Sequence, residues 1–163
     1  MFAIKKKYFL IIENIRDIEL KNIKIRNKFS IIYRYKNNRE ITSKLLAFRK
    51  KCKIKGIKLY IANNPTLANL LKADGIYLSA FNKSLRFLSL KKPNFKIIGS
   101  AHDLREITMK IKQGCDLIFL SKFFLVNYNK DAPYLGINKF NNFLKINKDL
   151  IPLGGINSSN LNM

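Results

Sequence analysis

The sequence predicts an α/β protein of the (βα) TIM-type barrel class, with parallel strands joined by helices. Seven short apolar runs alternate with stretches of helical periodicity, which is typical of parallel strands with crossover helices. The runs are continuously apolar, as in strands buried on both faces. A doubly wound sheet would also fit, but no GxGxxG follows the first run, which disfavours a dinucleotide-binding sheet. The expected strands are Tyr8–Ile12, Ser30–Arg34, Lys58–Ile61, Gly75–Leu78, Lys96–Gly99, Leu117–Leu120 and Leu150–Leu153.

Three stretches between these runs are expected to be helices. Ile41–Arg49 carries apolar residues at helical spacing. Pro65–Lys72 begins with Pro at the first helical position, and Asn64 before it is a favoured N-cap. Asp103–Lys112 has its own N-cap in Asp103 and ends before Gly114.

Composition limits the range of partners. The 163 residues include 32 Lys and Arg against 10 Asp and Glu, a formal net charge of +22. Such a field attracts nucleic acid, anionic membranes or phosphorylated molecules. The basic residues are spread along the whole chain, which disfavours a nucleic-acid interface. Our hypothesis for much of the charge is compositional drift towards Lys, Ile and Asn. No apolar run reaches the roughly 18 residues of a membrane span, so no membrane partner is expected.

The two cysteines, Cys52 and Cys115, are far apart and have no metal-ligand spacing. Reduced thiols in a cytoplasmic protein are therefore the default expectation.

Residues that follow the strands are the candidates for a site, because ligands of parallel α/β folds bind beyond the C-terminal strand ends. Arg34 and Lys36 follow the second strand and share a face, where two cations could hold a phosphate or pyrophosphate. Asn63 follows the third strand and Asn82 the fourth, and both could orient polar ligand groups or serve only as turn residues.

The later strands are followed by a histidine, a long segment and a pair of glycines. His102 is the single histidine, is more typical of a structural loop residue than of a general base, and has no expected partner nearby in sequence. The segment Ser121–Gly136 is long enough to cover a site. Gly154 and Gly155 could let backbone N–H groups approach a phosphate, or form a plain turn.

Five segments together, in order, resemble the thiamine phosphate synthase/TenI family from about Tyr8 to the end of the chain. The segments are Tyr33-Arg34-Tyr35-Lys36, Ala73-Asp74-Gly75-Ile76-Tyr77-Leu78, Ile97-Ile98-Gly99-Ser100-Ala101-His102, Gly114-Cys115-Asp116 with Ala132-Pro133-Tyr134-Leu135-Gly136, and Ile151-Pro152-Leu153-Gly154-Gly155-Ile156.

The resemblance implies a (βα)8 barrel and a transferase of thiamine biosynthesis. Synthases of this family condense hydroxymethylpyrimidine pyrophosphate with thiazole phosphate to give thiamine phosphate, with Mg²⁺ holding the pyrophosphate. By resemblance, Arg34 and Lys36 bind the pyrophosphate, Ser100 lies near the pyrimidine, and Gly154 and Gly155 hold the thiazole phosphate.

Several positions depart from the family pattern. Asn63 and Asn82 stand where the family has magnesium carboxylates, so no residue of this chain is assigned as a metal ligand. Lys130 is the substitute nearest to the synthase Thr-x-Thr-Lys run, and Lys122 stands where the TenI branch can carry a histidine. With Ser100, these two lysines complete the candidate catalytic set.

The resemblance also implies an eighth strand and helix, which are expected to be missing because the chain stops at Met163. Residues 1–163 are thus expected to form one C-terminally shortened domain, and a second copy of the chain could close the open sheet as a homo-oligomer. Two alternatives to the enzyme stay open. One is an inactive relative that only binds a phosphorylated thiamine precursor, and the other is a basic nucleic-acid-binding protein.

Overall fold

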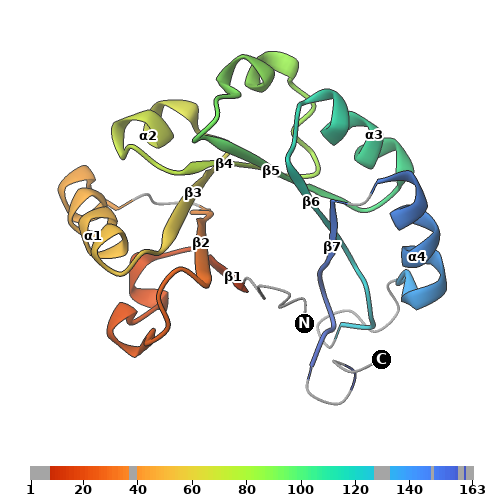
Figure 1. Cartoon of the computed structure of the whole chain (residues 1–163), viewed down its shortest axis with the longest axis horizontal. Coiled ribbons are helices and arrows are strands. Elements are labelled where there is room, and N and C mark those ends of the chain that lie inside the picture. The colour runs from red at the N-terminus through yellow and green to blue at the C-terminus, as the bar shows by residue number, and fades with distance from the viewer. Residues whose placement is uncertain (1–7, 37–39, 127–132, 148, 158–159, 161–163) are drawn as a thin grey trace, which may run out of the picture. The chain divides into compact units, whose positions relative to one another are not determined.

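The computed structural model describes residues 8–36, 40–126, 133–147, 149–157 and 160. Within them the chain alternates strands with helices, as expected (Figure 1). The elements are β1 (Tyr8–Ile12), η1 (Ile15–Asp17), η2 (Leu20–Asn22), β2 (Phe29–Tyr33), α1 (Thr42–Ile54), β3 (Lys58–Ala62), α2 (Pro65–Leu70), β4 (Gly75–Leu78), η3 (Leu85–Leu90), β5 (Lys96–Ala101), α3 (Leu104–Lys112), β6 (Leu117–Leu120), α4 (Gly136–Ile146) and β7 (Leu150–Pro152).

The strands follow the order β1-β2-β3-β4-β5-β6-β7 in one sheet. The pairs β1–β2, β2–β3 and β3–β4 are parallel, and so are β5–β6 and β6–β7. Sequential parallel strands with helical crossovers are the barrel topology that the sequence predicts. No helix in the described residues is long and apolar enough to cross a membrane.

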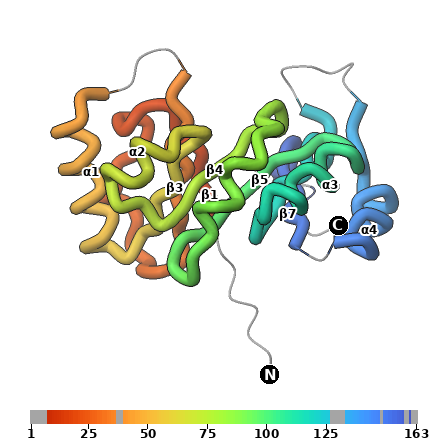
Figure 2. The backbone as a smooth tube through the Cα atoms, turned by 90° about the horizontal axis from the view of Figure 1, so that it is seen from above, coloured from red at the N-terminus to blue at the C-terminus, as the bar shows by residue number. Residues whose placement is uncertain are grey.

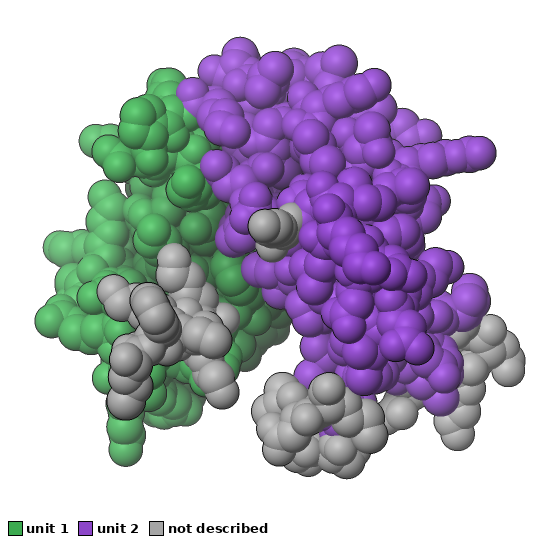
Figure 3. Space-filling model, turned by 45° about the vertical axis from the view of Figure 1, so that its right-hand side comes forward, with its two compact units in different colours: residues 1–77, 92–96 green, residues 78–91, 97–163 purple. Residues whose placement is uncertain are grey.

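The chain divides into two compact units, coloured separately in Figure 3. Unit 1 comprises residues 1–77 and 92–96, and unit 2 comprises residues 78–91 and 97–163.

In unit 1, α1 and α2 pack on one face of the strands, and Figure 2 shows both helices beside β3. This face presents alternate strand residues, which the two-residue period of a strand requires. The core beneath the helices includes Ile31, Tyr33, Leu45, Phe48, Leu59, Ile61, Leu67 and Ala68. Ile32 and Arg34 therefore belong to the opposite face of β2 and its extension.

In unit 2, α3 and α4 cover the strands in the same way. Their core joins Ala101, Ile107, Ile118, Leu120, Phe140 and Leu150. Because Ala101 faces these helices, its neighbour Ser100 faces the opposite side of β5. β5 extends through Ala101, so Ser100 lies inside the strand and not in the loop after it.

The helix α4 is not among those that the sequence predicts. It begins at Gly136 without a side-chain cap, and its asparagines at 138, 141 and 142 are weak helix formers. Phe140 is buried in the unit 2 core, with Phe143 and Leu144 packed against it. Packing of this apolar face stabilises a helix that local propensity does not indicate.

Candidate functional site

The C-terminal end of β2 gathers two cations around one carboxylate. Arg34 continues the strand ladder, with its N–H donating to the carbonyl of Ile12 at 2.8 Å. The Lys36 Nζ lies 2.7 Å from Glu13 Oε1, and the Arg34 Nη2 lies 4.0 Å from the same oxygen. Arg34 and Lys36 therefore converge, as the sequence predicts.

Glu13 is a site residue that sequence reasoning missed, although the rule that found Arg34 would also have found it. It directly follows β1, at the same edge of unit 1. All three side chains are partly exposed, so the ion pairs stabilise the fold by about 1 kcal/mol at most. Their interest is geometric, because one anionic oxygen marks the point that both cations reach.

The end of β3 brings Asn63 to the same edge of unit 1. Asn63 has a φ of 54°, a left-handed conformation that Asn tolerates better than most residues. Its backbone N–H donates to the carbonyl of Tyr77 at 2.8 Å. Asn64 is the expected N-cap of α2, since its Oδ1 accepts from the Leu67 N–H at 2.8 Å. The structure thus gives Asn64 a local role and leaves Asn63 at the strand end.

In unit 2, Asn82 lies in a tightly bonded loop after β4. The Asn82 Oδ1 accepts from the Ser84 N–H at 3.1 Å, and the Asn82 N–H donates to the Ser79 carbonyl at 3.0 Å. The backbone carbonyl of Asn82 accepts from Lys110 Nζ at 2.7 Å and from Gln113 Nε2 at 3.0 Å. Asn82 is therefore a well-fixed residue of the strand end, and Lys110 and Gln113 are partners that the sequence did not reveal.

Lys122 lies in a small pocket beside the ends of β5 and β6. The pocket has a volume of 290 Å³. Its two lysines give it a positive character that suits a phosphate group. Its lining residues are His102, Ser121, Lys122, Pro133, Tyr134, Leu135 and Lys139.

His102 has a partner, contrary to the expectation from the sequence. Its Nδ1 lies 3.0 Å from Glu106 Oε2, one helical turn along the chain, and its backbone N–H donates to the same oxygen at 2.7 Å. Glu106 is on α3, whose first turn is capped by Asp103. The i, i+4 spacing from His102 to Glu106 was the available signal. This pair holds the imidazole at the edge of the pocket.

The segment after β6 joins Lys122 to the glycine pair. The Phe123 N–H donates to the Leu153 carbonyl at 2.9 Å, and the Phe124 N–H donates to the Gly154 carbonyl at 3.0 Å. A Cβ on Gly154 would lie 3.5 Å from Lys122 Cα. The structure therefore brings Lys122, Gly154 and Gly155 together in unit 2, next to the chain that leads to α4.

Gly155 has no room for a side chain. Its φ is 71°, and a Cβ would overlap the backbone carbonyl oxygens of Phe124 and Leu125. The glycine pair is thus a close backbone crossing in addition to a candidate phosphate contact.

Ser100 is buried in β5 on the face opposite α3. Lys130, the remaining candidate, lies outside the described residues.

The residues at the implied magnesium positions do not fit that ion. Mg²⁺ prefers carboxylate oxygens, and Asn63 and Asn82 offer amides. Among the described residues, no three His, Cys, Asp or Glu side chains gather in a group that could hold a metal. Glu13 is a carboxylate at the strand ends of unit 1, but it is paired with Lys36.

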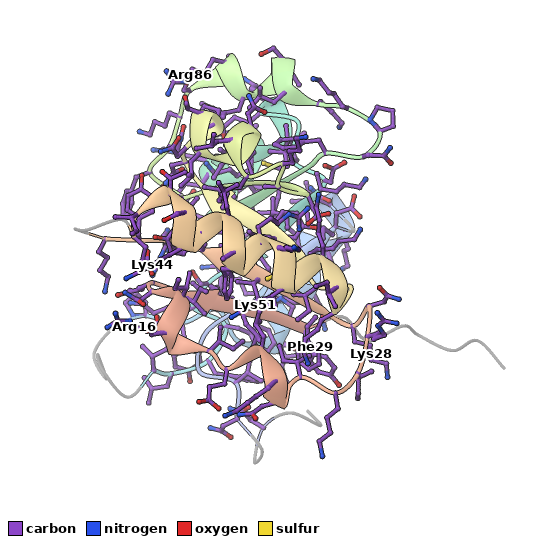
Figure 4. All side chains as sticks on the ribbon, turned by 90° about the vertical axis from the view of Figure 1, so that its left-hand side faces the viewer. Arg16, Lys28, Phe29, Lys44, Lys51 and Arg86 are labelled. Atoms are coloured by element: carbon purple, nitrogen blue, oxygen red, sulfur yellow. The ribbon has the colours of Figure 1, made fainter. Side chains whose placement is uncertain are left out.

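A larger pocket of 620 Å³ in unit 1 lies elsewhere, between α1 and the two short helices η1 and η2. Figure 4 views this side, with Lys44 and Lys51 on α1 and Arg16 on η1. None of the candidate site residues lines it, so the smaller pocket of unit 2 is the one relevant to the strand ends.

Comparison with known proteins gives a consistent result. A profile of the family TMP-TENI, thiamine monophosphate synthase, matches residues 4–163. The thiamine-phosphate synthase of Prochlorococcus marinus subsp. pastoris is 31% identical over 156 residues, covering 93% of this chain and 43% of that protein. That of Picrophilus torridus is 31% identical over 108 residues, covering 64% of this chain and 52% of that protein. The chain spans about half the length of these curated relatives.

A solved structure supports the fold. The thiamine phosphate pyrophosphorylase from Pyrococcus furiosus superposes with a TM-score of 0.70 at 22% identity, covering 96% of this chain and 78% of that chain. This likeness confirms the TIM-type fold class that the strand pattern predicts.

Proposed function

Because the chain belongs to the thiamine monophosphate synthase family, we propose that it is a transferase that makes thiamine phosphate. Its substrates would be hydroxymethylpyrimidine pyrophosphate and thiazole phosphate. The bond between the pyrimidine methylene carbon and a pyrophosphate oxygen breaks, and pyrophosphate leaves with the electron pair. The thiazole nitrogen then supplies its lone pair to that carbon, which forms the new C–N bond.

The observation that carries this proposal is the convergence of Arg34 and Lys36 on Glu13 Oε1. Negative charge builds up on the pyrophosphate as it leaves, so the reaction needs cations fixed where that charge develops. An oxygen of the pyrophosphate would take the place of the Glu13 carboxylate between the two cations. Arg34 can bind two oxygens at once, and Lys36 contributes a point charge.

Unit 2 would hold the second phosphate. Lys122 and Lys139 line the pocket beside the glycine pair, which suits the phosphate of the thiazole. Ser100 is placed by resemblance near the pyrimidine. Since Asn63 and Asn82 offer amides where the family has carboxylates, no step here is assigned to the metal.

Product formation tests the proposal. The purified chain is incubated with both phosphorylated precursors, with and without Mg²⁺, and thiamine phosphate is measured by chromatography. We expect product from the natural chain. We also expect the N63D/N82D variant to gain Mg²⁺-dependent rate, because carboxylates at both positions would restore suitable ligands.

Absence of product at all magnesium concentrations, together with thermal stabilisation by thiazole phosphate, would contradict a synthase and identify a binding protein. Salt-sensitive DNA binding with no effect of either precursor would instead support the nucleic-acid alternative. An N63D/N82D variant no more active than the natural chain would contradict the role given to the magnesium positions. The control is N69D/N82D, which introduces the same number of carboxylates but places one of them at Asn69, an exposed residue of α2.

The same proposal extends to the setting of the protein. We propose a cytoplasmic protein that acts on both precursors, folds as one domain over residues 1–163, and can associate with a second copy.

A further inference from the structure

Phe81 is unusual because a large apolar side chain is left in solvent at a strand end. It is 84% exposed, more than any other large hydrophobic residue in the described chain. It lies in the loop Ser79–Ser84, between β4 and η3. Exposing a phenyl ring in this way forgoes about 2 kcal/mol of burial, so a ligand that covers it would recover that free energy.

A buried lysine holds the loop that carries Phe81 by hydrogen bonds to its backbone. Lys110 on α3 is completely buried, and its Nζ donates to the backbone carbonyls of Ser79 and Asn82, both at 2.7 Å. Its third proton goes to Gln113 Oε1 at 2.9 Å. All three donors of the ammonium are therefore satisfied by neutral oxygens.

Gln113 also donates hydrogen bonds to backbone carbonyls of this loop. It is also completely buried, and its Nε2 donates to the carbonyls of Asn82 at 3.0 Å and Ser84 at 2.8 Å. Two side chains of one helical turn thus fix three carbonyls of the six-residue loop. The residues on both sides of Phe81 are anchored, which leaves the phenyl ring on a preorganised support.

The sequence makes room for the lysine. Its side chain passes across β5 at Gly99, where an added Cβ would lie 2.9 Å from Lys110 Cδ. Burying an ammonium among neutral acceptors is costly, and burial lowers the Lys110 pKa for the same reason. An apolar residue would fill the space at less cost, so what the lysine adds is the fixed geometry of the loop.

The ring of Phe81 has an aromatic neighbour at the candidate pocket. Its centroid lies 6.2 Å from that of His102, with the ring planes at 44°. His102 also lines the pocket that contains Lys122. An aromatic surface thus lies next to a cationic pocket within unit 2, which is the pairing that recognises a phosphorylated planar ring.

We propose that Phe81 is a specificity-determining residue that stacks on the heteroaromatic ring of the substrate, and that Lys110 and Gln113 are positioning residues that hold it there. The inference rests on the proposed function for the identity of the ligand. It goes beyond that function because it assigns ring recognition to the loop after β4.

A matched pair of ligands tests it. Thiazole phosphate and inorganic phosphate share the phosphate group, and only the first has a ring. Both are titrated by calorimetry into the natural chain, F81A, F81Y and the control L85A, which shortens another exposed apolar residue nearby. F81A is expected to weaken binding of the ring-bearing ligand about five- to tenfold and to leave phosphate binding unchanged. F81Y should restore the affinity to within about twofold, and L85A should match the natural chain.

A Lys110 variant tests whether this residue positions Phe81 or only stabilises the fold. K110M is expected to lose the same preference for the ring-bearing ligand, because the support of Phe81 is released. Thermal unfolding of K110M identifies a temperature at which this variant is folded, and the titrations are done at that temperature. F81A is expected to unfold at the same temperature as the natural chain, because the Phe81 side chain is exposed.

Three results would overturn the inference: equal affinity of F81A and the natural chain for the ring-bearing ligand, an equal loss for both ligands, or no binding of either ligand to the natural chain. Ring-dependent binding without product formation would leave it standing and would contradict the proposed function alone.

Discussion

Glu13 holds two cations together at the strand end where we propose that pyrophosphate binds. Its carboxylate oxygen lies 2.7 Å from Lys36 Nζ and 4.0 Å from Arg34 Nη2. A phosphate oxygen carries similar charge and accepts the same hydrogen bonds. The role that we propose for this cluster is binding, because the exposure of all three side chains leaves little contribution to fold stability.

Gly155 illustrates a residue whose role is steric. We expect Gly155→Ala to destabilise the protein by about 2–4 kcal/mol, from the left-handed φ together with overlap onto the Phe124 and Leu125 carbonyl oxygens. Gly136→Ala is the matched control. Gly136 has nearly the same φ, 70°, but the nearest atom to its added Cβ is 4.0 Å away. Chemical denaturation of both variants gives the comparison, and equal losses would show that φ alone requires glycine at position 155.

At the scale of elements, two strands are preceded by an aspartate whose carboxylate accepts a hydrogen bond from the neighbouring strand. Asp74 precedes β4 and its Oδ2 accepts from the Leu59 N–H of β3 at 2.8 Å. Asp116 precedes β6 and its Oδ2 accepts from the Ile97 N–H of β5 at 2.8 Å. Each carboxylate fixes the start of one strand against its neighbour. Asp74 also pairs with the buried Arg49, whose Nη1 lies 2.6 Å away, and so ties α1 to the same point.

Removal of these aspartates should cost unequal amounts. Asp116→Ala is expected to lower the free energy of unfolding by about 1–2 kcal/mol, through loss of a charged hydrogen bond. Asp74→Ala should lower it by about 2–4 kcal/mol, because the buried guanidinium of Arg49 then loses its carboxylate partner.

Asp149→Ala is the control for both variants, since Asp149 precedes β7 in the same way but is exposed. Denaturant titration of the three variants measures the differences. Similar values for Asp74→Ala and Asp149→Ala would contradict the role given to the motif.

The sequence predicts most of these elements. All seven strands are predicted to within two residues at each end, because continuous apolar runs bounded by glycine and polar residues are typical of strands buried in a parallel sheet. The caps Asn64 and Asp103 also mark the starts of two helices. α4 was missed because its stability comes from burial of Phe140, which depends on tertiary packing.

At the scale of the whole molecule, the candidate site could be predicted only where position along a strand decides it. Arg34, Lys36, Asn63 and Asn82 follow from that rule, and the family resemblance added Ser100, Lys122 and the glycine pair. Lys110 and Gln113 lie about 30 residues along the chain from the loop that they hold. No local sequence pattern predicts such a contact. In a chain with 32 Lys and Arg residues, a single lysine cannot be picked out as buried from the sequence.

The net charge of +22 also bears on the central claim, because such a field attracts any anion. A specific site must therefore be separated from general attraction. Lys28, labelled in Figure 4, makes this possible, because it precedes β2 whereas Arg34 and Lys36 follow that strand.

The most direct test is calorimetric titration of inorganic pyrophosphate into the natural chain, R34M/K36M and K28M at two salt concentrations. The site at the C-terminal end of β2 predicts at least a tenfold loss of affinity in R34M/K36M, because two charged hydrogen-bonding groups are removed. K28M should stay within about twofold of the natural chain. K28M removes one positive charge and R34M/K36M removes two. If the loss of binding free energy per charge removed is the same in both variants, attraction is general and the strand ends hold no pyrophosphate site.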